Sequence, residues 1–262
     1  MKIVFIGICL WCATLTVSAQ KAVKAADSIR RADSIPELAY AVFTADAGKA
    51  LKGFGFHRST LKNDDTKALP TDYFHLGSNT KAITAFIAGY LVERQKISWD
   101  TKFFTLFPEW KAGADPAYFN ITLSDLLSHR ARIKPYTAGT EFQQVPKTTG
   151  SKSEQRKNFA KYLLHSDPVK LTTAAYTYSN AGYSVAALML EQASGKTWED
   201  LVEEVLGKEL KLKYKFGWPN KGDDKQPSGH WMQDGKLTPV PGDTDYNLYL
   251  IEPAGGLSMP LG

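Results

Sequence analysis

The chain of 262 residues contains only two cysteines, Cys9 and Cys12, both close to its first residue. The rest of the chain has no thiol, which excludes disulfides, thiol catalysis and cysteine-ligated zinc there. The bulky residues Leu10 and Trp11 before Cys12 disfavour a lipoprotein-type cleavage site. The five histidines show no zinc-ligand spacing such as H-E-x-x-H. We therefore expect stability to come from packing and the chemistry to need no metal or organic cofactor.

The sequence has no run of five like charges, although its formal net charge is +5. A nucleic-acid-binding protein more often shows a basic stripe with interleaved aromatic residues. We therefore expect no nucleic-acid partner and interpret the positive charge as an aid to solubility or to weak attraction to anionic material. The length suits one large domain or two packed lobes, and we expect a monomer.

The sequence shows no apolar run of the length of an ordinary membrane span, about 20 residues. The apolar stretch Ile3–Leu15 follows the basic residue Lys2 and precedes the small residues Val17–Ala19. This order is typical of a secretory signal peptide. We predict that residues 1–19 are removed and that residues 20–262 form a secreted or periplasmic domain. An uncleaved segment that anchors the chain in a membrane is the alternative.

Strand signals are few. The segments Leu38–Thr44 and Leu51–His57 flank turn residues and predict a β-hairpin. Val23–Ile35 is polar and helix-prone, and from Phe216 onward the chain reads as loop. A two-stranded hairpin alone is only marginally stable in water. Further strands are needed to complete a sheet, and the sequence does not predict them.

Helix signals are stronger. Apolar residues at helical spacing predict a buried helix over Ser78–Lys96 and further helices over Ala181–Ala193 and Thr197–Leu206. The pair Thr122 and Asp125 resembles a capping box at the start of a short helix. The aromatic segment from Phe103 to Trp110 is interpreted as core packing.

The pattern Ser-x-x-Lys occurs three times, beginning at Ser18, Ser59 and Ser78. Only Ser78 opens a predicted buried helix, and one helical turn separates it from Lys81. The positive end of the helix dipole favours the Ser78 alkoxide, and apolar surroundings lower the pKa of a lysine so that it can act as a base. The Ser78 backbone N–H can donate to a developing oxyanion. The structural alternative is an N-cap serine followed by a solvated lysine.

The pattern Tyr-x-Asn occurs twice, at Tyr118 in a predicted loop and at Tyr178, just before an apolar helix. A phenol near a cationic lysine loses its proton more easily and can relay it to a leaving group. The amide of Asn180 can align a substrate carbonyl. A core tyrosine followed by a helix-capping asparagine is the alternative interpretation.

Together these segments resemble the serine β-lactamase superfamily, and more closely its branch of class C enzymes, D-Ala-D-Ala peptidases and esterases. The resemblance rests on Phe74–Lys81, Leu126–His129, Tyr178–Tyr183 and Pro253–Leu257. It implies an α+β, β-lactamase/transpeptidase-like fold with an antiparallel sheet flanked by helices and a helical lobe. His129 is expected to be a supporting structural residue.

The third motif of that family, a Lys- or His-x-Gly triplet on a strand, is not found. His75-Leu76-Gly77 precedes the serine, and Lys147–Gly150 has one residue too many. The family places the triplet after the segment that Pro253–Leu257 resembles. We therefore expect the chain to lack C-terminal sheet strands, the triplet and the second oxyanion donor.

The resemblance implies a serine hydrolase that forms a covalent acyl-enzyme. Ser78 is the expected nucleophile, Lys81 its base partner, Tyr178 the proton shuttle and Asn180 a substrate-binding residue. β-Lactams, D-Ala-D-Ala peptides of peptidoglycan and small esters are all candidate substrates. A non-catalytic penicillin-binding-type protein or an inactive fragment is the alternative.

Overall fold

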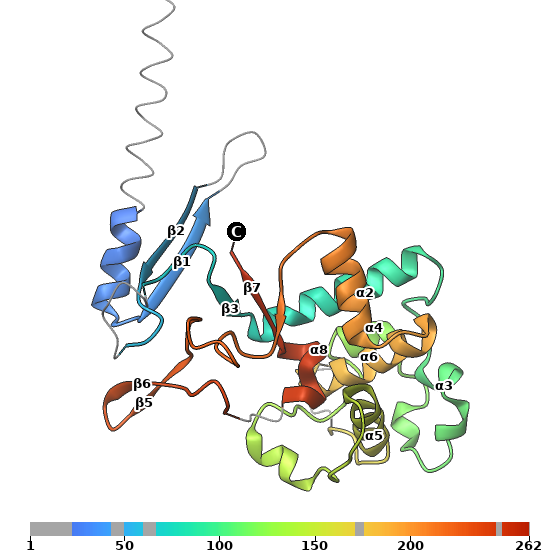
Figure 1. Cartoon of the computed structure of the whole chain (residues 1–262). Helices are drawn as coiled ribbons and strands as arrows, with labels where there is room; N and C mark the ends of the chain where they lie inside the picture. Colours follow the sequence, from blue (N-terminus) through green and yellow to red (C-terminus); the bar gives the residue numbers. More distant parts are fainter. Residues whose placement is uncertain (1–22, 43–49, 60–66, 171–175, 245–247, 262) are drawn as a thin grey trace, which may run out of the picture. The chain divides into compact units, whose positions relative to one another are not determined.

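The computed structural model describes residues 23–42, 50–59, 67–170, 176–244 and 248–261 (Figure 1). The chain divides into two compact units. Unit 1 is drawn from residues 1–74, 219–244 and 260–262, and unit 2 from residues 75–218 and 245–259. The predicted signal peptide, residues 1–19, lies outside the described residues. Among the helices that the structure describes, none combines the length and the apolar character that a membrane span requires.

Unit 1 contains the predicted hairpin. A helix over residues 23–32 precedes β1 (Glu37–Val42), which pairs antiparallel with β2 (Ala50–Gly55). Glu37 lies opposite Gly55 in the register. Gly55 has a φ of +96°, and a Cβ there would lie 2.0 Å from the carbonyl oxygen of Pro36. Only glycine therefore lets the end of β2 approach the start of β1 this closely.

A second hairpin makes the expectation of loop from Phe216 onward wrong. Strands β5 (His230–Gln233) and β6 (Lys236–Pro239) pair antiparallel around Asp234 and Gly235, which both have positive φ. Two positive φ values are what a tight two-residue hairpin turn requires. The strands are short and largely exposed, so they carry little alternation from which to predict them.

Unit 2 is built around α6 (Asn180–Ser194), in which every residue from Ala181 to Glu191 is buried. This helix explains the apolar sequence that predicted it, and it ends at Gly195, whose φ is +71°. Figure 1 shows other helices gathered around it. The helices in contact with it are α2 (Thr80–Glu93), α3 (Phe103–Leu106), α4 (Leu123–Leu127), α5 (Lys152–Leu164), α7 (Trp198–Val202) and α8 (Glu252–Gly255).

Short strands and 3-10 helices lie between the longer elements of the chain. The strands β3 (Tyr73–His75), β7 (Leu257–Pro260) and β4 (Lys215–Phe216) form a sheet of order β3-β7-β4, in which β4 and β7 are antiparallel. Short 3-10 helices lie at η2 (Gly77–Asn79), η3 (Pro108–Trp110), η4 (Pro116–Tyr118), η5 (Gly139–Gln144) and η7 (Leu248–Ile251). The aromatic segment from Phe103 to Trp110 contributes four buried rings, which confirms its interpretation as core: Phe103, Phe104, Phe107 and Trp110.

The capping box predicted at Thr122 forms, and a second capping box lies at the start of α7. Thr122 and Asp125 cap α4, and Thr197 and Asp200 cap α7. The predicted end before Gly207 is wrong, because α7 continues as a π-helix over Glu203–Glu209. The buried residues Val205 and Leu206 hold this segment against the core despite the glycine that follows them.

Candidate active site

Ser78 lies in an exposed turn between a strand and a long helix. Strand β3 ends at His75, Gly77 turns the chain with a φ of +52°, and η2 carries Ser78 before α2 begins at Thr80. The predicted start of the α-helix at Ser78 is thus two residues early, because the serine belongs to a tighter 3-10 turn. The hydroxyl of Thr80 accepts a hydrogen bond of 3.2 Å from the Leu257 N–H, which joins this turn to β7.

Lys81 projects from the first turn of α2 and is buried, with 7% of its surface exposed. Its Nζ lies 2.6 Å from Oδ1 of Asn180, 2.9 Å from the carbonyl oxygen of Ala254 and 3.3 Å from Oγ of Ser78. Burial lowers the pKa of the Lys81 amine, and its interaction with Tyr178 only partly opposes this effect. Lys81 is therefore buried rather than solvated, although the atoms that contact its amine are polar and not apolar as predicted.

Tyr178 meets the same serine from the loop before α6. Its Oη lies 2.6 Å from Oγ of Ser78, and the Nζ of Lys81 lies 4.7 Å from the centre of its ring. Burial alone would raise the pKa of the Tyr178 phenol, but its interactions with Lys81 and Ser78 lower it below the ordinary value. Residues 100 positions apart in the sequence are thus in hydrogen-bond contact.

Asn180 is held by the backbone on one side and by the lysine on the other. Its Nδ2 donates to the carbonyl oxygen of Tyr136 at 2.9 Å, and its backbone N–H donates to the carbonyl oxygen of Pro135 at 2.8 Å. The neighbouring Ser179 caps α6 by accepting from the Gly182 N–H. Asn180 was expected to align a substrate, and its amide oxygen here accepts from Lys81.

His129 supports this loop, as expected of a structural residue. Its Nδ1 accepts a hydrogen bond of 3.1 Å from the Ser179 N–H, and its ring centre lies 4.6 Å from that of Tyr178. Burial, followed by the nearby Lys81 charge, lowers the pKa of His129. A neutral imidazole can accept at Nδ1, which a protonated one cannot.

The segment Pro253–Leu257 takes part through its backbone, a contribution that sequence reasoning did not assign. The Ala254 carbonyl accepts from Lys81, and the Pro253 carbonyl accepts from the Thr84 hydroxyl at 2.7 Å. A backbone carbonyl can be supplied by any residue type, so the sequence does not identify it as an acceptor. The one signal in the sequence is the resemblance of Pro253–Leu257 to a segment of the β-lactamase superfamily.

The described residues of the other occurrences of each pattern have other hydrogen-bond partners or are buried elsewhere in their own unit. Ser59 belongs to unit 1 and donates to the carbonyl oxygen of Leu237, whereas its partner Lys62, like Ser18, lies outside the described residues. In the second Tyr-x-Asn, Tyr118 is buried and Asn120 accepts from Lys102. In the described part of the chain, one group of three potential metal ligands occurs, and it shares no residue with the Ser78 site.

The chemistry open to this arrangement is proton transfer at a hydroxyl. Ser78 contacts a phenol and an amine at once, and the pKa values of both groups are lowered. Each of these groups therefore releases its proton more readily than the free side chain does.

Comparison with known proteins shows which family the chain resembles. A family model described as Beta-lactamase matches residues 23–261. The unguisins hydrolase ungD' of Aspergillus campestris is 29% identical over 172 residues, which are 61% of this chain and 29% of that protein. The teichoic acid D-alanine hydrolase of Staphylococcus aureus is 23% identical over 189 residues, which are 71% of this chain and 41% of that protein. The chain thus spans less than half the length of these relatives.

Solved structures share the fold. A class C β-lactamase in complex with cefoxitin superposes with a TM-score of 0.72 at 18% identity, over 93% of this chain and 62% of that one. The D-amino acid amidase of Ochrobactrum anthropi superposes with a TM-score of 0.67 at 17% identity, over 92% of this chain and 66% of that one. These likenesses confirm the predicted β-lactamase/transpeptidase-like α+β fold, whereas the expectation of missing C-terminal strands stays a prediction. The family match covers nearly all of the described residues, and the chain belongs to the β-lactamase family.

Proposed function

We propose that the protein hydrolyses amide or ester carbonyl compounds through a covalent acyl-enzyme on Ser78. The observation that carries the proposal is the double contact of the Ser78 Oγ, 2.6 Å from the Tyr178 Oη and 3.3 Å from the Lys81 Nζ. A serine hydroxyl is a weak nucleophile unless an adjacent base removes its proton. Here the exposed hydroxyl has two such neighbours, and one of them is a buried amine.

The proposed first half-reaction begins with attack of Oγ on the substrate carbonyl carbon while the neutral Lys81 amine takes the hydroxyl proton. The carbonyl oxygen becomes an oxyanion, to which the Ser78 N–H donates one hydrogen bond. The tetrahedral intermediate then expels its amine or alcohol, which receives a proton from the Tyr178 phenol. Lys81 returns its proton to Tyr178, so that an acyl ester on Ser78 remains.

In the second half-reaction, a water molecule attacks the ester carbonyl, and Tyr178 with Lys81 takes its proton. Collapse of the second intermediate releases the carboxylic acid and returns the proton to Ser78 Oγ. Asn180 serves this cycle in two ways in our proposal. It orients the substrate and, through the hydrogen bond of 2.6 Å, keeps the Lys81 amine in place.

The substrate class in this proposal follows from relatives and from chemistry. Structural neighbours include a D-amino acid amidase, and one sequence relative is a D-alanine hydrolase. β-Lactams, D-Ala-D-Ala peptides and small esters all present a carbonyl carbon that a serine hydroxyl can attack. The predicted signal segment of residues 1–19 supports action outside the cytoplasm, where peptidoglycan peptides occur.

The test is turnover of one substrate from each class: nitrocefin, a D-Ala-D-Ala peptide and p-nitrophenyl butyrate. We expect hydrolysis of at least one, and Ser78→Ala should lower its rate by at least about 10³-fold, as loss of a nucleophile does in other serine hydrolases. Ser59→Ala is the matched control, since Ser59 also heads a Ser-x-x-Lys pattern, and it should retain activity. Turnover that persists in Ser78→Ala would contradict the proposal.

The alternative, a non-catalytic binder or an inactive fragment, predicts another outcome. Such a protein would bind penicillin reversibly, or not at all, without hydrolysis and without a covalent adduct. Hydrolysis that requires Ser78 excludes it.

A further inference from the structure

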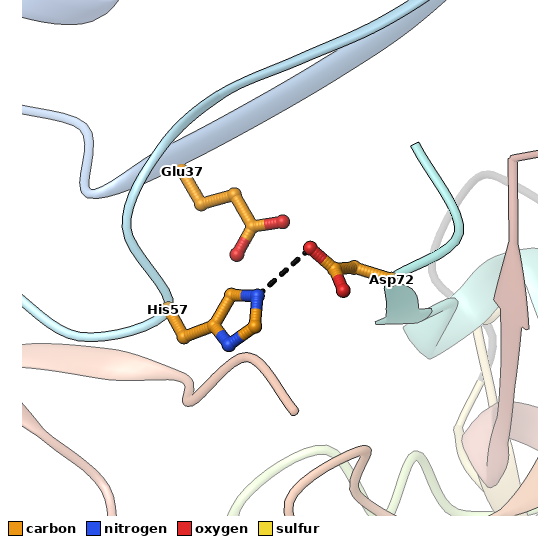
Figure 2. A group of neighbouring side chains, drawn as sticks. All are labelled: Glu37, His57 and Asp72. Atoms are coloured by element: carbon orange, nitrogen blue, oxygen red, sulfur yellow. Dashed lines mark hydrogen bonds and ion pairs between the residues drawn. The ribbon is translucent and has the colours of Figure 1, made fainter. Parts of the chain in front are cut away.

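Unit 1 contains a group of metal-ligating side chains that the proposed hydrolase does not use. Glu37 opens β1, His57 lies two residues beyond the end of β2, and Asp72 precedes β3. One ligand atom from each lies within 4.8 Å of the others. Figure 2 shows the two carboxylates directed toward each other beside the His57 ring, whose Nε2 is on their side.

The backbone of unit 1 builds this convergence. The Phe56 N–H donates to the Pro36 carbonyl oxygen at 2.9 Å, which holds the end of β2 beside the start of β1. The Ala68 N–H donates to the Gly55 carbonyl oxygen at 2.9 Å, which brings the segment before Asp72 to the same place. Three parts of the chain are therefore fixed around one point by main-chain hydrogen bonds, independently of the side chains that meet there.

The polar atoms at this point are not satisfied by protein groups. Both carboxylate oxygens of Glu37 are buried and accept no hydrogen bond among the described residues. His57 and Asp72 are 3% and 2% exposed. Asp72 Oδ2 is 2.8 Å from His57 Nε2 and also accepts from the Leu69 N–H. Buried polar groups in folded proteins almost always have a partner, so two open carboxylate oxygens aimed at a histidine and a second carboxylate indicate an absent ligand.

The charge at this point is not balanced either. In the described part of the chain, no lysine or arginine forms an ion pair with Glu37 or Asp72. Two carboxylates therefore lie close together with buried oxygen atoms and without a cationic side chain. A cation bound between the carboxylates would supply the missing positive charge.

We propose that Glu37, His57 and Asp72 bind a divalent cation, Zn²⁺, as a structural site of unit 1. Zinc accepts imidazole nitrogen and carboxylate oxygen as ligands, whereas Mg²⁺ and Ca²⁺ prefer oxygen ligands alone. Bonds of about 2.1 Å in a tetrahedral site place ligand atoms about 3.4 Å apart. The three ligand atoms already lie within 4.8 Å of one another, and the His57 Nε2 and Asp72 Oδ2 atoms, now 2.8 Å apart, would have to separate slightly. A water molecule would supply the fourth ligand.

A proton shared between Glu37 and Asp72 is the rival explanation of the same geometry. It makes an opposite prediction for Glu37→Gln. An amide can replace a protonated carboxyl group as a hydrogen-bond donor, so the rival expects no loss of stability and no metal in any variant. The zinc proposal expects the same substitution to remove the metal.

The experiment measures zinc in the full chain, freed of any affinity tag, after chelation, incubation with Zn²⁺ and dialysis. Mass spectrometry of the metal content should give one Zn²⁺ per chain, and the thermal midpoint should rise by several degrees with zinc present. Both effects should vanish in Glu37→Gln and persist in His165→Gln, a control that removes an exposed histidine. Replacement of zinc by Co²⁺ should give a visible absorption spectrum of mixed nitrogen and oxygen ligation.

Several results would overturn the proposal. The first is a wild-type protein that retains no zinc, and the second is a Glu37→Gln protein that retains as much as the wild type. Retention of Mg²⁺ or Mn²⁺ in preference to Zn²⁺ would also contradict it. If Glu37→Gln does not fold, the cobalt spectrum of the wild type and the zinc content of Asp72→Asn decide the question.

Discussion

The amide oxygen of Asn180 lies 2.6 Å from the amine of Lys81, and this contact defines how the lysine can act. A neutral amine has two N–H donors and one lone pair. Its two shortest contacts are with acceptors that have no proton to give, Asn180 Oδ1 and, at 2.9 Å, the Ala254 carbonyl oxygen. If both N–H groups donate there, the lone pair is left for the Ser78 hydroxyl at 3.3 Å. This arrangement supports our proposal that a neutral Lys81 accepts the serine proton.

Asn180→Asp should move the pH dependence of the reaction. Burial lowers the pKa of Lys81, and the base must be unprotonated, so the rate rises as pH rises through that pKa. A carboxylate at position 180 favours the ammonium form and raises the pKa. The acid limb of kcat/KM should therefore shift to higher pH, and activity at pH 7 should fall by about tenfold or more.

The matched control for this substitution is Asn120→Asp, which changes the asparagine of the other Tyr-x-Asn. That residue accepts from Lys102 and has no contact with Lys81, so the pH profile should stay as in the wild type. An unchanged limb in Asn180→Asp would show that Lys81 is not the base.

Tyr178→Phe should slow acyl transfer while leaving the fold intact. The substitution removes only the oxygen that lies 2.6 Å from Ser78 Oγ. Loss of a group that transfers a proton typically costs about 10²–10⁴-fold in rate. Tyr176→Phe makes the same change at an exposed tyrosine of the same loop and should have no effect on kcat. Equal rates in the two variants would remove Tyr178 from the mechanism.

Thr84→Val should destabilise the packing of α2 against the Pro253–Leu257 segment. The Thr84 hydroxyl donates to the Pro253 carbonyl at 2.7 Å and accepts from Trp198 Nε1 at 3.1 Å. Both hydrogen bonds are buried. Valine keeps the shape but leaves the indole N–H without this partner, which costs about 1–3 kcal/mol of unfolding free energy. Urea unfolding measures this, with the exposed Thr105→Val as a control expected within about 0.5 kcal/mol of the wild type. A cost as small as that of the control would contradict the role of the hydroxyl.

Arg156→Met should lower the unfolding free energy more than Thr84→Val does. The guanidinium is fully buried and donates twice to Glu199 at 2.8 Å and once to Glu191 at 2.6 Å. Removing one partner of a buried ion pair typically costs about 3–5 kcal/mol. Lys157→Met, at an exposed position of the same helix, should change the unfolding free energy by about 0.5 kcal/mol or less.

The penalty in Arg156→Met should depend on pH. Burial alone would raise the pKa of Glu199, but Arg156 holds it below its ordinary value. A carboxyl whose folded pKa is lowered contributes stability above its unfolded pKa, and this contribution is lost as pH falls through the folded value. The difference between wild type and variant should therefore be largest at neutral pH and shrink on acidification. A difference that is constant with pH would place the effect in packing instead.

Local signals in the sequence predicted much of this structure. Capping boxes and apolar periodicity depend on neighbouring residues only, so α2, α4, α6 and α7 could be located from them. No helix is predicted over α5, because this segment is polar and its buried residue Arg156 is charged. Ser151 and Glu154 form a capping box at its start, which is the local signal for this helix.

The site was predictable where side chains carry the chemistry and unpredictable where the backbone does. Ser78, Lys81, Tyr178 and Asn180 have recognisable residue types in two short patterns. The Ala254 carbonyl has none, and the partners of Asn180 depend on how a loop folds over the motif. The Glu37, His57 and Asp72 group combines three segments with no shared spacing, so only tertiary structure reveals it.

Peptide mapping after reaction with a fluorophosphonate, and in parallel with penicillin, tests the central claim most directly. The account predicts one adduct per chain, on the peptide that contains Ser78, and none in Ser78→Ala. An adduct on any other residue, or labelling that survives Ser78→Ala, would contradict it.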